Sequence, residues 1–179
     1  MSDVTIYTDV AEPVSVPSPS SVTERTLQSF VEREVSLLDG RRFEEWVDLF
    51  TDDGAYWVPA QPGQTDPLSH VSLFYDDKQT MLIRVQRLRH PQMHCQDPAS
   101  ATVRLVSNFT FGEPDIERQE WRVTSKFIML EDRPETDRRL FGGTYHHRLR
   151  MSPEGLKIVE KRVELTNAGA RFPSLSQPF

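Results

Sequence analysis

Cysteine is nearly absent from this sequence. Cys95 is the one cysteine among 179 residues, so the chain cannot form an internal disulfide. No apolar run approaches the length that spans a membrane, and the N-terminus lacks the basic and apolar regions of a signal peptide. A glycine-rich phosphate-binding loop is also missing. These absences predict a soluble, cytoplasmic protein without a phosphate-cradling motif.

Basic residues are fewer than acidic residues. The chain has 21 Lys and Arg residues against 27 Asp and Glu residues, which gives a formal net charge of −6. Binding to phosphate groups needs a basic face. The balance therefore argues against nucleic acid or an anionic membrane as the partner.

Regular structure is expected only after the first 20 residues. Residues 12–20 are rich in proline and serine and cannot nucleate a core, so residues 1–20 are interpreted as a flexible tail. The length suits one domain, which we place at residues 21–179.

A helical pattern begins the domain. Apolar residues recur at steps of three and four from Leu27 to Leu38, and Glu34 is the polar exception on that stripe. Ser21 and Glu24 have the spacing of a capping box at its start, and Asp39-Gly40 predicts its end.

A second, shorter helix is predicted at residues 41–50. Its stripe is Phe43, Trp46, Val47 and Phe50, and Trp46 in its middle is interpreted as core packing. We expect residues 52–54 to form the turn that ends it, with Gly54 at a positive φ, and residues 55–58 to form a strand.

The remainder is mostly strand. A strand at 70–76 leads to Asp77, a predicted N-cap for a helix at 78–89. Four long strands then follow, separated by short turns, which makes them an antiparallel meander. They are expected at 102–111, 117–131, 139–151 and 156–166. The pattern predicts an α+β fold in which a strongly curved antiparallel sheet wraps over two or three helices as a cone.

One loop has the residue types of a metal site. His90, His94 and Asp97 surround Cys95, and two histidines with a carboxylate are the ligands of a mononuclear iron site. The prolines make this segment irregular and no further ligand accompanies it, so we interpret the cluster as solvated and expect no tight metal binding.

The adjacent histidines His146 and His147 lie in a predicted strand, so their rings face opposite sides of the sheet and cannot chelate one ion. The inward ring could be a hydrogen-bonded core histidine or a general base. Asp53 and Tyr56 are the other candidate bases if the chain is an enzyme by itself.

Four segments in order carry a family resemblance. The first runs from Phe30-Val31-Glu32-Arg33-Glu34 to Tyr56-Trp57-Val58-Pro59, and the second joins 73–77 (LFYDD) to 84–88 (RVQRL). The third joins 96–100 (QDPAS) to 104–108 (RLVSN), and the fourth joins 141–143 (FGG) to 161–163 (KRV). Over about residues 22–167 the chain resembles the small (β) subunits of Rieske-type aromatic-ring-hydroxylating dioxygenases.

The resemblance implies the cone-shaped NTF2-like (cystatin-like) fold and a structural role without catalytic, cofactor-binding or metal residues in this chain. It implies a large (α) subunit that holds a Rieske [2Fe-2S] cluster and mononuclear Fe(II) and inserts both atoms of O2 into an aromatic ring. Three copies of each subunit would form a hexamer, with electrons arriving from NAD(P)H through a reductase or ferredoxin. A Rieske centre needs two cysteines, which this chain lacks.

Two other functions stay open at this point: a stand-alone isomerase or dehydratase with the same fold, and a small-ligand-binding module. A filled cone and a flat apolar outer patch would favour the subunit. Asp97, Arg104, Asn108 and Trp46 are the predicted structural or interface residues. Arg104 and Asn108 are expected on one strand face, where they either fix the preceding loop within the chain or reach across to the large subunit or a neighbouring small subunit. In either case Arg104→Ala is expected to weaken assembly without affecting the redox centres.

Overall fold

The computed structural model describes residues 22–89, 99–134, 137–172, 175 and 177–179. Helices come before the long strands, as predicted. In chain order the elements are α1 (Glu24–Asp39), α2 (Phe43–Asp48), β1 (Phe50–Pro59), β2 (Ser72–Asp77), α3 (Lys78–Arg89), β3 (Ala101–Phe111), β4 (Glu120–Asp132), β5 (Arg139–Ser152) and β6 (Gly155–Leu165).

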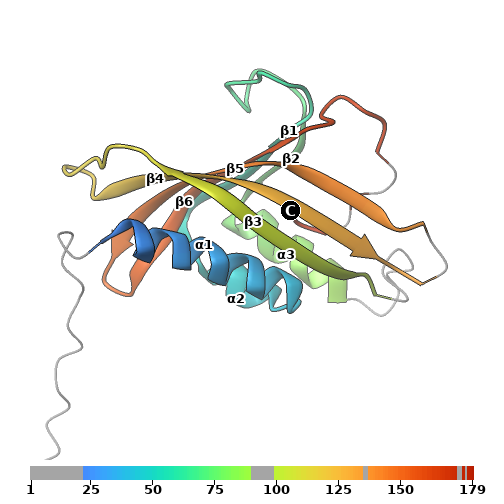
Figure 1. The fold of residues 1–179 in the computed structure, drawn as a ribbon, viewed down its shortest axis with the longest axis horizontal. Coiled ribbons are helices and arrows are strands. Elements are labelled where there is room, and N and C mark those ends of the chain that lie inside the picture. Colours follow the sequence, from blue (N-terminus) through green and yellow to red (C-terminus); the bar gives the residue numbers. More distant parts are fainter. Residues whose placement is uncertain (1–21, 90–98, 135–136, 173–174, 176) are drawn as a thin grey trace, which may run out of the picture.

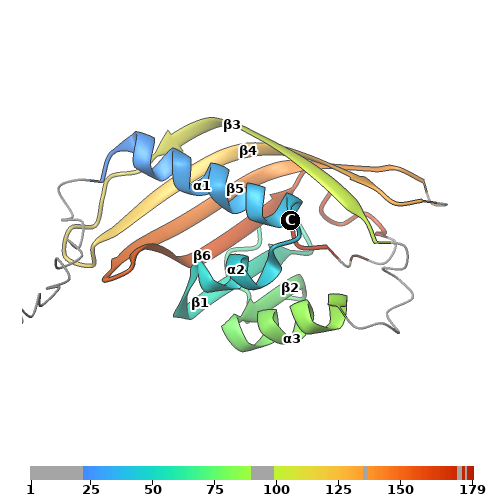
Figure 2. The ribbon, with the colours of Figure 1, turned by 90° about the horizontal axis from the view of Figure 1, so that it is seen from below.

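The strands form one six-stranded sheet in the order β2-β1-β6-β5-β4-β3. Figure 1 shows the sheet curving over α1, α2 and α3, which all lie on its concave side. The view from below shows α1 running along the long strands, while α2 and α3 cover β1 and β2 (Figure 2). The α+β cone and the meander of β3 to β6 are confirmed. The parallel pairing of β1 with β6 was not predicted.

Helix α1 buries the predicted apolar stripe against the sheet. Its start differs from the prediction, because the N-cap is Thr23, whose hydroxyl accepts a hydrogen bond from the Thr26 amide at 3.2 Å. The predicted capping box of Ser21 and Glu24 is wrong, since Glu24 is the first helical residue and so stands too early to close such a box. The predicted end at Asp39-Gly40 is confirmed.

Helix α2 ends at Asp48, and β1 already begins at Phe50. Residues 52–54 therefore lie within the strand, and the predicted turn there is wrong. Gly54 is not among the positive-φ residues of the described chain. A Cβ on Gly54 would lie 2.8 Å from the Thr51 carbonyl oxygen and 3.0 Å from that of Ile158. Glycine is required there because a side chain would meet the preceding residues of β1 and the backbone of β6.

Trp46 lies in the core, as predicted. Its ring meets Phe50 and Tyr56 edge to face, with centroid distances of 5.3 and 5.5 Å. Helix α3 also begins where predicted, because the Asp77 carboxylate accepts a hydrogen bond from the Thr80 amide at 2.8 Å.

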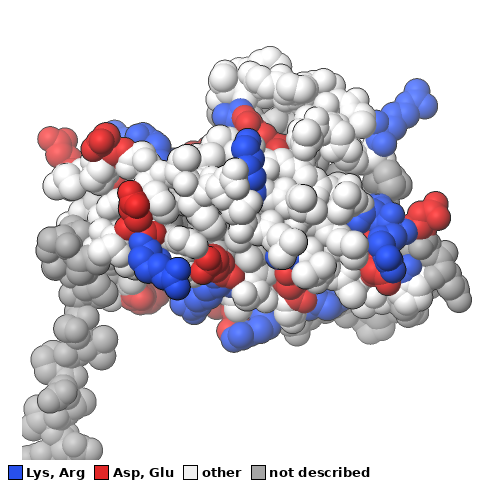
Figure 3. Space-filling view, viewed as in Figure 1, with Lys and Arg blue, Asp and Glu red and all other residues white. Residues whose placement is uncertain are grey.

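Charges on the face seen in Figure 3 are scattered, with both signs interspersed among larger uncharged areas. That face therefore carries no extended basic patch of the kind that nucleic-acid binding needs. No helix within the described ranges is long and apolar enough to cross a membrane.

Candidate functional site

The inside of the cone contains a buried carboxylate with three hydrogen-bonding neighbours. Glu34 projects from α1, and its Oε1 lies 2.8 Å from Nζ of Lys161 on β6. Its Oε2 lies 2.8 Å from Nε2 of His147 on β5. The Trp46 indole N–H on α2 donates to Oε1 at 2.9 Å. Two helices and two strands are thus joined through one side chain.

These residues meet because each occupies the inward position of its element. Glu34 lies on the apolar face of α1, and the alternation along each strand places His147 and Lys161 on the concave side of the sheet. The side chains of Glu34, His147 and Lys161 are fully buried. Glu34 and the inward histidine were visible in the sequence. Lys161 was missed, although it shares an alternating pattern with Val163 and Leu165, where a lysine is unusual.

The environment keeps Glu34 ionised. Burial by itself would raise the pKa of this carboxyl, but the charges and hydrogen bonds of Lys161 and His147 outweigh burial and hold its pKa well below the ordinary value of 4.5. Burial lowers the pKa of Lys161, and the Glu34 carboxylate opposes that shift. The pair is therefore a buried ion pair with further hydrogen-bond support.

The C-terminal residues of the sequence fill the space beside this cluster. Phe179 is 1% exposed. Its carbonyl oxygen accepts a hydrogen bond from Lys161 Nζ at 2.7 Å, and its amide donates to the Tyr56 hydroxyl at 2.9 Å. Figure 1 shows the end of the sequence between the sheet and the helices, and the view from below shows it near the end of α1 (Figure 2).

Arg104 extends the interior network toward α1. Its guanidinium is fully buried, pairs with the Asp39 carboxylate at the end of α1 and donates to the Pro178 carbonyl oxygen at 2.6 Å. Of the two predicted roles, the contacts in the structure are those of bonding within the chain. They join the end of α1 to the C-terminal residues. Most of the loop that precedes β3, at 90–98, lies outside the described residues.

The prediction that Arg104 and Asn108 share a face is wrong. Asn108 has a φ of 53° and is exposed, and the pairing of β3 with β4 shifts register between Ser107 and Thr110. A bulge of this kind breaks the two-residue alternation on which the prediction depended. Asn108 therefore needs no partner inside the sheet.

The other candidate residues are dispersed. Asp97, with His90, His94 and Cys95, lies outside the described residues. Asp53 lies at the surface and pairs with Arg150 at 3.1 Å, so it is not in the cone. The opposite orientation of the two histidines is confirmed, because His147 points inward while His146 lies on the outer face, 3.2 Å from Glu164.

The interior is poorly arranged for acid–base chemistry. The Glu34 carboxylate is already occupied by Trp46, Lys161 and His147, and its side chain has no solvent exposure. A general base has to reach the proton of a substrate directly or through a water molecule. Burial raises the pKa of Tyr56, which makes its hydroxyl a weaker acid still. The Glu34 cluster therefore connects two helices to two strands, and its polar groups are not accessible to a substrate.

The residues that the structure describes also fail to fit an iron centre. Among them no group of three or more His, Cys, Asp or Glu side chains is arranged to hold a metal ion. The whole sequence has one cysteine, so it cannot supply the two cysteines of a Rieske cluster.

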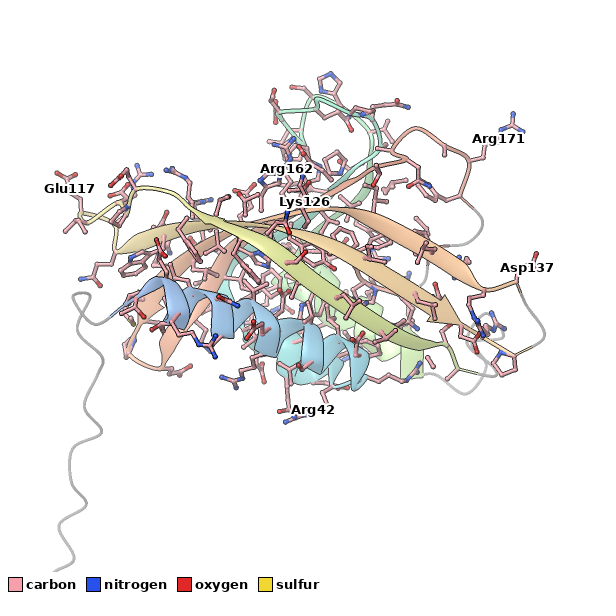
Figure 4. The ribbon with its side chains drawn as sticks, viewed as in Figure 1. Arg42, Glu117, Lys126, Asp137, Arg162 and Arg171 are labelled. Atoms are coloured by element: carbon pink, nitrogen blue, oxygen red, sulfur yellow. The ribbon has the colours of Figure 1, made fainter. Side chains whose placement is uncertain are left out.

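A hollow of about 390 Å³ lies on the outer face, lined by residues of β4, β5 and β6. Its basic residues are largely neutralised by neighbours. Arg148 pairs with both Glu120 and Glu160 at 3.2 Å, and Arg162 pairs with Glu164. Figure 4 shows Lys126 and Arg162 on the side of the sheet away from Arg42 and the helices. We find no anion site in this hollow.

An apolar patch occupies another part of the outer face. It consists of Val103 and Leu105 on β3, Ile128 and Leu130 on β4, and Leu140 on β5. The register places them in two adjacent rows, with Leu105 opposite Ile128 and Val103 opposite Leu130, which in turn lies opposite Leu140. Leu105 is 70% exposed and Leu140 69%. Clustered exposed apolar residues of this kind mark an interaction surface.

Comparison with known proteins identifies the family. A family model described as ring hydroxylating beta subunit matches residues 33–170. The chain belongs to the ring-hydroxylating dioxygenase β-subunit family. The resemblance found in the sequence is thereby confirmed.

Individual members of this family agree over most of the chain. The small oxygenase component of the p-cumate 2,3-dioxygenase system of Pseudomonas putida is 34% identical, over 84% of this chain and 86% of the relative. The 2-halobenzoate 1,2-dioxygenase small subunit of Burkholderia cepacia is 31% identical, over 78% of this chain and 86% of the relative. Among solved structures, the β subunit of benzoate 1,2-dioxygenase from Burkholderia mallei has a TM-score of 0.68 and 25% identity, over 82% of this chain and 93% of that one.

Proposed function

We propose that this chain is the non-catalytic small subunit of a terminal oxygenase that dihydroxylates an aromatic ring with O2. The large subunit supplies the Rieske [2Fe-2S] cluster and the mononuclear Fe(II), and three copies of each subunit assemble in the cytoplasm. Electrons reach the large subunit through a reductase or ferredoxin. The relatives are subunits of dioxygenases named after an arene (benzene) and after an arene carboxylate (p-cumate). The proposal therefore specifies an aromatic ring as the substrate and no substituent on it.

The observation that carries this proposal is the apolar patch of Val103, Leu105, Ile128, Leu130 and Leu140. A sheet face that meets water normally carries polar residues at outward positions. Here two rows of outward positions across three strands are apolar. We assign the patch to contact with the large subunit, since small subunits of this family are components of oxygenases that also have a large one.

The interior supports the same conclusion. A stand-alone isomerase or dehydratase needs an open pocket with a free acid or base, whereas the Glu34 cluster is buried and saturated. Phe179 occupies the neighbouring space. The filled interior and the apolar outer patch both favour a subunit over an enzyme.

Co-purification tests the proposal. The tagged chain, expressed with the large subunit from the same genome, is expected to retain a partner that contains iron and shows a Rieske absorption spectrum. Leu105→Asp places a charge in the middle of the patch and is expected to reduce the retained large subunit at least tenfold. Ile83→Asp on α3, where the wild-type residue is 51% exposed, is the control outside the patch and is expected to retain the large subunit.

Two results would contradict the proposal in different ways. If no large subunit is retained by the wild-type chain, the assignment to an oxygenase complex fails. If folded Leu105→Asp retains the large subunit as well as Ile83→Asp does, the patch is not the contact surface. Circular dichroism of each variant establishes that it is folded.

A further inference from the structure

We infer that the interior of the cone is a binding site for a 3-arylpropanoyl group, and that the chain occupies this site with its own Phe179. The site has one subsite for an aromatic ring and one for a carbonyl or carboxylate oxygen. The inference concerns this chain alone and does not depend on the large subunit.

The ring subsite is built from aromatic side chains. The Phe179 ring stands edge to face against Phe141, with centroids 5.1 Å apart, and against Phe74 at 6.2 Å. Phe74 in turn lies 6.0 Å from the Tyr56 ring. Edge-to-face neighbours favour an aromatic ring over an aliphatic group of the same size, because the ring quadrupoles complement each other.

The oxygen subsite is built from fully buried polar groups. Lys161 Nζ donates to the Phe179 carbonyl oxygen at 2.7 Å and to Glu34 at 2.8 Å. A buried ammonium has three donors and loses stability when one is left without an acceptor. An oxygen acceptor is therefore required at this position, and a carboxylate is a strong acceptor for an ammonium group.

A further polar group of the site remains unused. The Tyr145 ring lies 4.4 Å below Lys161 Nζ, and its fully buried hydroxyl makes no hydrogen bond of ordinary geometry, although the Arg104 guanidinium is close enough to influence its pKa. Buried hydroxyls are almost always bonded. The site thus has more donors than residues 177–179 satisfy.

The contacts of residues 177–179 with the rest of the chain resemble those of a bound ligand. These residues belong to no helix or strand. Lys161 and Arg104 donate hydrogen bonds to the carbonyl oxygens of Phe179 and Pro178, and the Phe179 amide donates to the Tyr56 hydroxyl. A segment without ladder hydrogen bonds can open at a lower free energy than the sheet itself. A 3-arylpropanoate has the ring, the two-carbon spacing and the oxygen of Phe179, so it can make the same ring contacts and accept the hydrogen bond from Lys161.

The test uses the full chain with Phe179→Ala, which removes the ring that anchors the segment. We expect 3-phenylpropanoate to bind this variant with one-to-one stoichiometry by calorimetry and to raise its melting temperature. Propanoate lacks the ring and 3-phenylpropanol lacks the carboxylate, and each is expected to bind at least tenfold more weakly. Phe109→Ala, which removes a partly buried phenylalanine ring on β3 that stacks on Phe111, is the matched control and should bind none of them.

A second substitution tests the polar contacts separately. Adding Tyr56→Phe to Phe179→Ala removes the hydroxyl that accepts the Phe179 amide. It is expected to weaken the binding of N-acetylphenylalanine several-fold and to leave the binding of 3-phenylpropanoate, which has no amide, unchanged. Adding Lys161→Met to Phe179→Ala is expected to weaken the binding of both compounds.

The inference is overturned if folded Phe179→Ala binds no 3-phenylpropanoate. It is also overturned if Phe179→Ala binds 3-phenylpropanoate no better than Phe109→Ala does, or no better than it binds 3-phenylpropanol. If Phe179→Ala does not fold alone, we expect 3-phenylpropanoate to restore its circular dichroism spectrum while propanoate does not. Failure of that rescue also overturns the inference. Loss of large-subunit binding has no bearing on any of these results, so the two proposals fail separately.

Discussion

Lys161 Nζ lies 2.8 Å from Glu34 Oε1, and neither side chain is exposed to solvent. This ion pair connects the last strand of the sheet to the first helix, which are far apart in the sequence. Isolated buried charges are strongly destabilising, so each member of the pair depends on the other.

Removing one charge of this pair should destabilise the fold. Glu34→Leu leaves the Lys161 ammonium without its carboxylate, and we expect a loss of about 3–5 kcal/mol in the free energy of unfolding, measured in urea. The double variant Glu34→Leu/Lys161→Met removes both charges and should lose less than the two single variants added together. Strict additivity would show that the two residues do not stabilise each other.

Stability should depend on pH through Glu34. The pKa of Glu34 in the folded chain lies below its ordinary value of 4.5, so the folded state binds fewer protons than the unfolded state. The stabilisation is fully present above about pH 4.5 and is lost as the pH falls below it. In Glu34→Gln the free energy of unfolding should change less over this acidic range than in the wild type. Glu154→Gln, at an exposed glutamate, should leave the change in unfolding free energy over this pH range as it is in the wild type.

Trp46 contributes through packing and through its indole N–H. Trp46→Ala empties a fully buried position and should cost roughly 3–5 kcal/mol of unfolding free energy. Trp46→Phe keeps much of the packing but removes the donor to Glu34, and we expect a loss of about 1.5–3 kcal/mol. A denaturant midpoint that Trp46→Ala leaves unmoved would contradict the buried position.

Arg104→Ala should lower the stability of the isolated chain, and weaker assembly should follow from that loss. The substitution leaves the Asp39 carboxylate and the Pro178 carbonyl without their buried partner, so we expect the isolated chain to lose about 3–5 kcal/mol of unfolding free energy. Assembly with the large subunit should weaken as a consequence, while the redox centres stay unchanged. Arg122→Ala, at an exposed position of β4, is the control and should leave both unfolding and assembly unchanged. An isolated Arg104→Ala chain as stable as wild type but unable to assemble would favour a direct interface role.

Metal binding by the purified chain should be absent. His90, His94 and Asp97 offer three ligands in one loop without a further ligand nearby in the sequence, so we expect no iron or zinc to survive dialysis. Elemental analysis measures this directly. Stoichiometric metal that His94→Ala abolishes would contradict the expectation.

Local patterns predicted most of the elements correctly, because periodicity and capping depend on neighbours in the chain. The stripe of α1, the N-cap at Asp77 and the four strands of the meander are of this kind. The errors occurred where a distant segment decides the local conformation. Residues 52–54 have the composition of a turn, yet they lie within β1, in a register shift between Phe50 and Ala55, which both pair with β6. The bulge at Asn108 cancels an alternation that looked regular.

The sequence by itself determined the family, the helical and strand periods and the inward direction of one of two adjacent histidines. It also showed that Glu34 interrupts an apolar stripe. Only the tertiary structure decided what Glu34 is for. Its partners Trp46, His147 and Lys161 come from three other elements, and Phe179 reaches the same space from the far end of the sequence. Burial and the pairing of charges are properties of the assembled interior, so no pattern of neighbours along the chain specifies them.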